Sequence, residues 1–163
     1  LNGYVNISVI NAAVADSRGW RTLIQSSLDS GRHSTYHHGL PESGSVEVET
    51  WTLDAFLTAK DWPVVDLVKV DVEGAEMDVL HGMSGLLERT PGLKLIIEFN
   101  PPLLQSAGVD PLAFIERLTS LQFSIAWVDE SQGVIPPGEW DVDDPVSRLL
   151  RDGSSVNLFC TKA

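Results

Sequence analysis

Apolar runs that predict strands recur along the chain. Residues 64–72 (VVDLVKVDV) are almost continuously Val and Leu, a pattern typical of a central parallel strand covered on both faces. Residues 5–14 (VNISVINAAV) are mostly apolar and β-branched, and residues 93–99 (LKLIIEF) form a similar run, so both predict buried strands. Residues 123–128 and 156–161 predict two further strands.

Helical patterns separate several of these strands. An apolar stripe after Gly74 predicts a helix that ends at Thr90-Pro91-Gly92; its members are Val79, Leu80, Met83, Leu86 and Leu87. Pro101-Pro102 is expected to end the next strand, and Asp110-Pro111 supplies an N-cap and a first-turn proline for a second helix. Residues 148–151 predict a short helical turn. The resulting order of strand, helix, strand, helix, strand, strand predicts an α/β fold whose last two strands form an antiparallel pair.

The segment before this alternation has a different pattern. Residues 22–26 and 46–53 predict strands, and in the second of these Val and Thr positions alternate with Glu47, Glu49 and Trp51. Residues 27–45, rich in Gly, Ser and His, lie between them. We therefore expect an antiparallel hairpin with a long loop, of the kind that can act as a lid.

Composition narrows the class of protein. The 163 residues suffice for one domain, and the net charge of -12 argues against binding to nucleic acid or to anionic membranes. No apolar run reaches the roughly 18 residues that a membrane helix needs, so we expect no membrane insertion. Cys160 is the only cysteine, which excludes an intrachain disulfide and a cysteine zinc site. It lies in an apolar run and is expected to be buried, and a reducing, cytoplasmic setting is expected.

Carboxylates gather where two of the predicted strands end. Asp71, Glu73 and Glu76 fall within six residues at a strand-to-helix turn, and Glu98 ends the following strand. If these strands pair in parallel, Glu98 emerges about 5 Å from the strand of Asp71. Such acids can bind a metal, accept a proton from a hydroxyl or hold a cationic ligand.

A purely structural interpretation competes for some of these acids. Acidic side chains in the first turn of a helix are stabilised by the helix dipole, which could account for Glu73 and Glu76. Asp71 and Glu98 end buried strands, where an unpaired charge is costly, and this favours a functional role for them.

Other residues that often carry chemistry give weaker signals. His33 and His37 are four residues apart, but they lie in the predicted loop and not on a helix, so a metal site is not expected there. His81 is expected at the surface, and the five tryptophans are expected to pack in the core. The sequence contains no glycine-rich phosphate loop and no serine nucleophile elbow.

Taken together, several segments resemble the FkbM methyltransferase family. The most specific match is residues 65–76 (VDLVKVDVEGAE), which resembles the family pattern "vdliKiDvEGaE". Weaker matches, which together extend over nearly the whole chain, are Asn11–Ala12–Ala13–Val14–Ala15–Asp16, Leu53-Asp54 with Phe56-Leu57, Val79-Leu80-His81-Gly82, Ile96-Ile97-Glu98 and Asn157-Leu158-Phe159-Cys160.

This resemblance implies a class I, Rossmann-like methyltransferase fold with sheet order 3-2-1-4-5-7-6 and strand 7 antiparallel. Residues 1–163 would form a partial domain from strand 3 onward, with an inserted hairpin at about residues 20–53. No segment matches strands 1 and 2, which carry the glycine-rich loop for the cofactor and the acid that binds its ribose. We therefore expect a chain truncated at its N-terminus and inactive by itself.

The activity implied by the resemblance is transfer of a methyl group from S-adenosylmethionine to a hydroxyl of a small metabolite, sugar or glycolipid. Asp71, Glu73, Glu76 and Glu98 are the catalytic candidates, and Asn11, Ala12, Ala13 and Asp71 are the candidates for cofactor binding. No metal site is assigned, because the ligand pattern is not clear, and the oligomeric state stays open. The alternatives are a non-catalytic binding or oligomerisation module and a metal-dependent hydrolase that uses the carboxylates directly.

Overall fold

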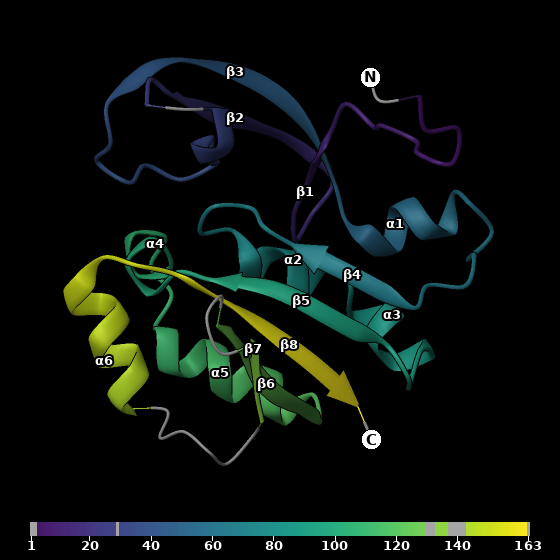
Figure 1. Ribbon diagram of the computed structural model, residues 1–163. Coiled ribbons are helices and arrows are strands. Elements are labelled where there is room, and N and C mark those ends of the chain that lie inside the picture. The colour runs from purple at the N-terminus through teal and green to yellow at the C-terminus, as the bar shows by residue number, and fades with distance from the viewer. Residues whose placement is uncertain (1–2, 29, 130–132, 137–142, 163) are drawn as a thin grey trace.

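The computed structural model describes residues 3–28, 30–129, 133–136 and 143–162, which form two β-sheets with helices packed around them (Figure 1). The smaller sheet has the order β1-β3-β2, with β1 at Ala13–Val14, β2 at Gly19–Ser26 and β3 at Glu42–Trp51. The larger sheet has the order β4-β5-β8-β6-β7. Its strands are β4 Leu67–Val70, β5 Lys94–Phe99, β6 Phe123–Asp129, β7 Gly133–Ile135 and β8 Val156–Lys162. The prediction of an α/β protein is confirmed.

Pairing in the larger sheet follows most of the sequence pattern. Strands β4 and β5 are parallel, and β8 runs antiparallel to both β5 and β6. The expected antiparallel pair near the end of the chain is therefore confirmed. The central position predicted for residues 64–72 is wrong, because within the described residues β4 pairs with β5 alone. Val64 and Leu67 are exposed as a result.

Six α-helices and one 3-10 turn are described. They are α1 Leu53–Thr58, α2 Glu76–Gly82, α3 Ser84–Arg89, α4 Pro101–Ser106, α5 Pro111–Ser120, α6 Asp143–Asp152 and η1 Ser30–Arg32. The helical turn predicted at residues 148–151 is thus part of the longer α6. The helix predicted after Gly74 is divided, since α2 and α3 meet at Met83.

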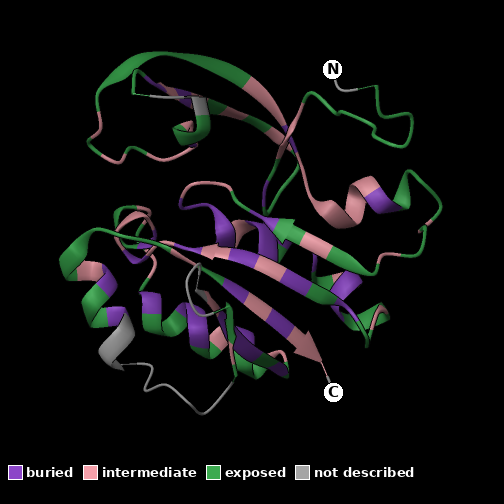
Figure 2. Ribbon diagram, in the orientation of Figure 1, coloured by how far each residue is buried: buried purple, intermediate pink, exposed green. Residues whose placement is uncertain are grey.

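The hydrophobic core lies between the larger sheet and its helices. Leu95, Ile97 and Phe99 of β5 are fully buried, and Figure 2 shows this alternation of buried and more exposed positions along the strand. The ring of Phe99 lies 6.1 Å from that of Phe114 on α5, centroid to centroid. Burial of such large apolar surfaces is the main source of folding free energy. This core fixes the end of β5, and therefore the position of Glu98.

Side-chain caps explain where several helices begin. Asp110 accepts a hydrogen bond from the backbone N–H of Leu112 at the start of α5, as the sequence predicts. Asn100 caps α4 in the same way through the N–H of Leu103. The sequence pattern predicts only that Pro101-Pro102 end a strand, whereas both prolines also occupy the first turn of α4. Proline is tolerated there because the first helical N–H groups have no partner within the helix.

Asp54 caps α3 from a distant part of the chain. Its carboxylate accepts hydrogen bonds from the N–H groups of Gly85 at 2.7 Å and Leu86 at 2.9 Å. Thr52 caps α1 through the N–H of Ala55. The Leu53-Asp54 segment singled out in the sequence therefore has a structural role that joins α1 to α3.

The hairpin predicted before β4 is present, with longer strands than expected. Strands β2 and β3 pair antiparallel from Gly19 to Ser26, and β3 already begins at Glu42, inside the predicted loop of residues 27–45. The loop that remains contains η1 and a bridge between Ile24 and Ser34. It folds back towards the end of β4, where it contributes to the site described below.

The buried strand predicted for residues 5–14 is wrong. Only Ala13–Val14 form a strand, and Val5 and Val9 are 100% and 82% exposed. An apolar, β-branched segment becomes a buried strand only where a neighbouring strand accepts its backbone hydrogen bonds and another layer covers its side chains. Within the described residues neither is available to residues 3–12.

Candidate active site

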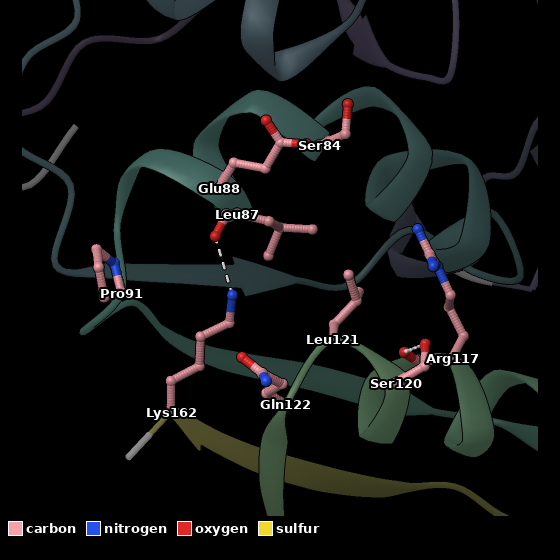
Figure 3. A pocket seen from close by; sticks show the side chains of 9 residues that line it. All are labelled: Ser84, Leu87, Glu88, Pro91, Arg117, Ser120, Leu121, Gln122 and Lys162. Atoms are coloured by element: carbon pink, nitrogen blue, oxygen red, sulfur yellow. Dashed lines mark hydrogen bonds between the residues drawn. The ribbon is translucent and has the colours of Figure 1, made fainter.

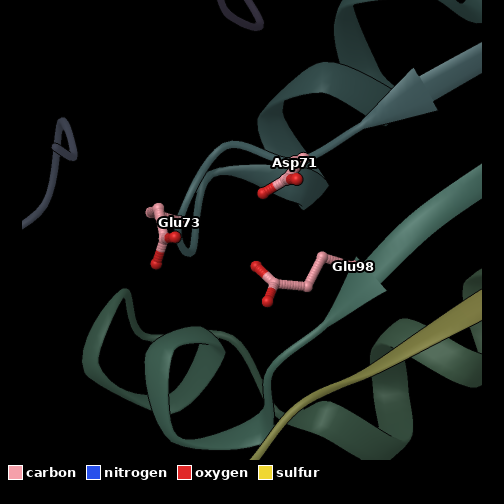
Figure 4. A group of neighbouring side chains, drawn as sticks. All are labelled: Asp71, Glu73 and Glu98. Carbon is pink, nitrogen blue, oxygen red and sulfur yellow. The ribbon is translucent and has the colours of Figure 1, made fainter. Parts of the chain in front are cut away.

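Three carboxylates meet at the carboxyl ends of β4 and β5. Parallel pairing places Val70 beside Ile97, so that Asp71 and Glu98 follow at the same edge of the sheet. One carboxylate oxygen from each of Asp71, Glu73 and Glu98 lies within 4.8 Å of the other two, as Figure 4 shows. We call these three side chains the acid cluster. The prediction that Glu98 emerges beside the strand of Asp71 is confirmed.

The loop that carries Glu73 has an unusual backbone. Glu73 has a φ of 51° and Gly74 a φ of 96°, both in the left-handed region. For a residue with a side chain this conformation costs free energy, and it persists only where surrounding contacts enforce it. In Figure 4 the turn brings the Glu73 side chain back towards Glu98.

Glu76 supports this loop from inside. Its side chain is fully buried, and its Oε1 accepts hydrogen bonds from the N–H groups of Val72 at 3.4 Å and Gly74 at 3.2 Å. Burial raises the pKa of Glu76, while these backbone hydrogen bonds act in the opposite direction. Of the four predicted catalytic acids, the structure therefore brings Asp71, Glu73 and Glu98 together, whereas Glu76 is buried and bonded to the loop that carries Glu73.

Electrostatics make Glu73 the carboxyl that changes charge near neutral pH. Burial, together with the charges of Glu98, Asp71 and Glu76, raises its pKa to about 7. Asp71 pairs with Lys69, and Oε1 of Glu98 accepts a hydrogen bond from Ser155 at 2.8 Å. Oε2 of Glu98 is buried and has no hydrogen-bond partner. Glu73 can therefore take up and release a proton, and the cluster as a whole can attract a cation.

The hairpin loop forms hydrogen bonds with the backbone of Glu73. Ser34 Oγ donates a hydrogen bond to the Glu73 carbonyl at 2.7 Å, and Nε2 of His38 lies 2.7 Å from the same oxygen. Nδ1 of His38 contacts the Ser106 hydroxyl on α4. A Cβ added to Gly74 would lie 2.8 Å from Cε1 of His38, so only glycine leaves room for this ring. We call the contacts of Ser34 and His38 with Glu73 the hairpin latch.

A second set of contacts joins the hairpin to α2. Asp78 accepts hydrogen bonds from Tyr36 Oη at 2.8 Å and from Arg21 Nη1 at 2.5 Å. Burial and the bond to Asp78 raise the pKa of Tyr36, which keeps its hydroxyl protonated as the donor. Sequence reasoning found none of these residues, because the hairpin loop carries no local pattern that indicates what it contacts.

A cavity of about 430 Å³ lies in front of the acid cluster. Glu73 and Glu98 line it, together with His38 and Arg32 from the hairpin loop and Asn100 after β5. Ser154 and Ser155, from the segment before β8, also line it. Its volume lies within the usual range of roughly 300–1,000 Å³ for small-molecule sites. The lining is rich in hydrogen-bonding groups, which suits a polar ligand.

The other predicted residues lie outside this cavity. Asn11 is exposed, and Ala13 belongs to β1, which pairs with β3 in the smaller sheet. Of the four candidates for cofactor binding, only Asp71 is part of the acid cluster. His33 accepts a hydrogen bond from the Ser26 N–H, His37 pairs with Glu42 and His81 is exposed. Cys160 is buried, as expected, and burial raises its pKa to about 12.

No helix in the part of the chain that the structure describes is long and apolar enough to cross a membrane.

Comparisons with known proteins give two findings that agree. The family described as "Methyltransferase FkbM domain" matches residues 4–125. A hexuronic acid methyltransferase, AglP of Haloferax volcanii, is 32% identical to this chain over 87 residues. That alignment covers 53% of this chain and 33% of the relative, so the chain matches about a third of the relative's length. No solved structure matches significantly.

Proposed function

Because this chain belongs to the FkbM methyltransferase family, we propose that the protein transfers a methyl group from S-adenosylmethionine to a hydroxyl of a sugar-like acceptor. The observation that carries the proposal is the acid cluster, in which Glu73 has a pKa of about 7 beside a polar cavity. A hydroxyl becomes a good nucleophile only as it loses its proton, and a carboxylate with a pKa near neutrality is well suited to accept that proton.

The charge of the cluster fits the proposed donor. When bound, S-adenosylmethionine supplies an electrophilic methyl group on a positively charged sulfonium. Asp71, Glu73 and Glu98 concentrate negative charge at one edge of the sheet, and this attracts a cation. Asp71 is the proposed residue for positioning the donor. Asn11, Ala12 and Ala13 are proposed, from the family resemblance, to bind the donor, with Ala12 and Ala13 at its adenine.

In the proposed mechanism the acceptor occupies the cavity in front of the cluster. Glu73 accepts the proton of the reacting hydroxyl, while the hairpin latch holds the Glu73 backbone in place. Glu98, oriented by Ser155, binds the same or a neighbouring hydroxyl. Holding the nucleophile close and in line is the larger part of such catalysis, since alignment removes much of the entropic barrier.

The acceptor is proposed to be a sugar or a sugar acid. Support comes from the relative that acts on hexuronic acid and from the cavity lining of Asn100, Ser154 and Ser155, whose groups can bond sugar hydroxyls. Arg32 also lines the cavity and lowers the pKa of Glu73, so it carries positive charge near the cluster. It is the proposed partner for an acidic group on the acceptor.

A hexuronic acid offers two kinds of oxygen to a methyl donor, and the cluster favours the hydroxyl. A carboxylate acceptor would have to approach three carboxylates against electrostatic repulsion, and it would not need a base. A neutral hydroxyl avoids the repulsion and uses the base.

The order of strands in the larger sheet supports a class I methyltransferase fold. In the order β4-β5-β8-β6 the first two strands are parallel and β8 is antiparallel to its neighbours. This is the order 4-5-7-6 that the resemblance implies for the second half of such a sheet, with β7 added at the edge.

The test is methyl transfer from labelled S-adenosylmethionine by the protein expressed from its complete gene. The acceptors are a hexuronic acid glycoside, its methyl ester and the corresponding neutral hexose glycoside. We expect label on the hexuronic acid glycoside and on its methyl ester. The label on the hexuronic acid glycoside should survive mild alkali, because a methyl ether is stable under conditions that hydrolyse a methyl ester. A chelator should leave the rate unchanged.

Two results would contradict the proposal. Label that alkali releases from the glycoside would make the carboxylate the acceptor. If a protein shown to be folded transfers no label to any of the sugars, the proposal of a sugar-like acceptor is wrong.

A further inference from the structure

A second and larger cavity lies at the opposite end of the sheet from the acid cluster. Its volume is about 710 Å³, and it lies among α3, α5, the turn before β6 and the end of β8 (Figure 3). Lys162 at the end of β8 neighbours the start of β6, and Thr161 pairs with Lys94, the first residue of β5. Glu98 lies four residues further along β5, about 13 Å at the usual rise of a strand. The two cavities are therefore distinct.

The most unusual feature of this cavity is Arg117 of α5. Its Nε is buried without a hydrogen-bond partner, and no carboxylate of the described residues lies within ion-pair distance of its guanidinium. A buried donor without an acceptor is costly, and in most proteins such groups are satisfied. Because the chain has 23 acidic and 11 basic residues, an arginine without a carboxylate partner is unusual in it.

Lys162 adds a second positive charge, and its position is fixed. Its Nζ donates a hydrogen bond to the carbonyl of Leu87 at 2.9 Å and lies 4.9 Å from the ring centroid of Phe123. In Figure 3, Lys162 and Arg117 lie on opposite sides of the cavity. Both contacts of Lys162 leave its charge without a carboxylate partner in the described part of the chain.

The surface between these two cations is partly apolar. Leu87 and Leu121 line the cavity between them, and the side-chain amide of Gln122 lies close by (Figure 3). Glu88 is the one acidic residue of the lining, and it is exposed. The lining as a whole thus offers a net positive charge next to an apolar surface.

We propose that this cavity binds a small molecule that joins an anionic group, a phosphate or a carboxylate, to a compact apolar body. Arg117 is the principal ligand of the anion, since its guanidinium can form paired hydrogen bonds with phosphate or carboxylate oxygens. Lys162 supplies the second charge, and Leu87 and Leu121 contact the apolar body. The proposal is independent of the methyl-transfer reaction, because it uses none of the residues of the acid cluster.

Phenyl phosphate is a suitable probe, because it has both parts of the proposed ligand. It would be titrated into the isotope-labelled chain while backbone amide resonances are followed by NMR. We expect saturable shifts at Leu121, Gln122 and Lys162, with at least tenfold weaker binding of inorganic phosphate or phenol alone. Equal affinity for inorganic phosphate would overturn the apolar half of the proposal.

Variants test the role of Arg117. The Arg117→Met variant keeps an unbranched apolar side chain without the charge, and it should bind at least tenfold more weakly. Arg151→Met is the matched control, because Arg151 is an exposed arginine on α6 that pairs with Asp152, and its affinity should be unchanged. If Arg117→Met does not fold, Arg117→Lys should still bind more weakly than the unaltered chain. Unchanged binding by a folded Arg117 variant, or shifts confined to the acid cluster, would overturn the proposal.

Discussion

Glu73 combines a strained backbone with a carboxyl whose pKa is raised. Its φ of 51° is held by the hairpin latch at the carbonyl, and its carboxyl group lies against Asp71 and Glu98. Strain of this kind is found where surrounding contacts force a residue into position, often at functional sites. At the scale of single residues, the proposed proton transfer requires that this one side chain is both well positioned and able to take a proton.

Replacing Glu73 with Gln should stabilise the chain at high pH. The folded chain keeps the Glu73 proton up to about pH 7, whereas the unfolded chain releases it near the ordinary pKa of 4.5. The stability of the unaltered chain therefore falls as the pH rises from 4.5 to 7, and Glu73→Gln removes that loss. After allowance for screening by solvent, we expect a gain on the order of 1 kcal/mol at pH 8 and almost none at pH 4.

Denaturant unfolding at both pH values measures this difference. Glu88→Gln is the matched control, because Glu88 is exposed and lies outside the acid cluster. If Glu73→Gln is less stable than the unaltered chain at pH 8, the folded protein stabilises the negative charge of Glu73, and the raised pKa is contradicted.

The residues of the site differ in how far the sequence could predict them. Asp71, Glu73 and Glu98 could be predicted because they lie at or just after the ends of two apolar runs, and strands joined by a crossover helix pair in parallel. Ser34 and His38 contact Glu73 from 39 and 35 positions away, through a loop whose path no periodicity encodes. The helix dipole is the only structural role that the sequence suggests for Glu76, and its bonds to Val72 and Gly74 depend on the path of the loop, which no local pattern encodes.

At the scale of elements, the hairpin of β2 and β3 acts on the loop after β4. Removing the Ser34 hydroxyl by Ser34→Ala should free the Glu73 carbonyl on one side and loosen the loop. We expect the turnover number to fall about tenfold, the usual effect of losing one well-placed hydrogen bond, with little change in the KM of the methyl donor. Steady-state kinetics of the protein expressed from its complete gene measures both constants.

Ser45→Ala is the control for this experiment, because Ser45 is an exposed residue on β3 of the same hairpin. A fall in turnover of equal size in both variants would mean that the hairpin acts only through its general stability. Unchanged turnover in Ser34→Ala would exclude a role for the latch.

The close approach of α2 to Ala15, the residue after β1, depends on Gly82. A Cβ built at Gly82 would lie 2.1 Å from the carbonyl oxygen of Ala15, which is part of the backbone and cannot easily move. We expect Gly82→Ala to cost about 2 to 3 kcal/mol of unfolding free energy, the upper part of the range for overpacked sites. Gly92→Ala is the control, because a Cβ there meets no atom within 4 Å. Denaturant midpoints of the two variants should differ clearly, and equal midpoints would disprove the close approach.

Elements with strong local signals were predicted well. The α5 helix has a capping aspartate and a first-turn proline, and β5, β6 and β8 are apolar runs that pair as expected. The failures have physical reasons. Residues 5–14 have the composition of a strand, but such a strand needs hydrogen-bonding neighbours that the described residues do not provide. The prolines of α4 were interpreted as a strand end alone, although the same residues also favour a helix start.

At the scale of the whole molecule, the two ends of the larger sheet hold cavities with different charged groups. The acid cluster lies at the carboxyl ends of β4 and β5, and the cavity with Arg117 and Lys162 lies at the other end. In open α/β sheets ligands bind beyond the carboxyl ends of the strands, which agrees with the placing of the proposed reaction. The hairpin of β2 and β3, which forms most of the smaller sheet, lies over that end, as Figure 1 shows.

The pH dependence of methyl transfer, compared between the unaltered protein and Glu73→Gln, tests this account most directly. If Glu73 accepts the proton, kcat/KM of the unaltered protein should rise about tenfold per pH unit and level off above its pKa of about 7. Glu73→Gln should lose about 10²- to 10⁴-fold in rate and should lack this rise. A Glu73→Gln protein with an undiminished rate and the same pH profile would contradict the central claim.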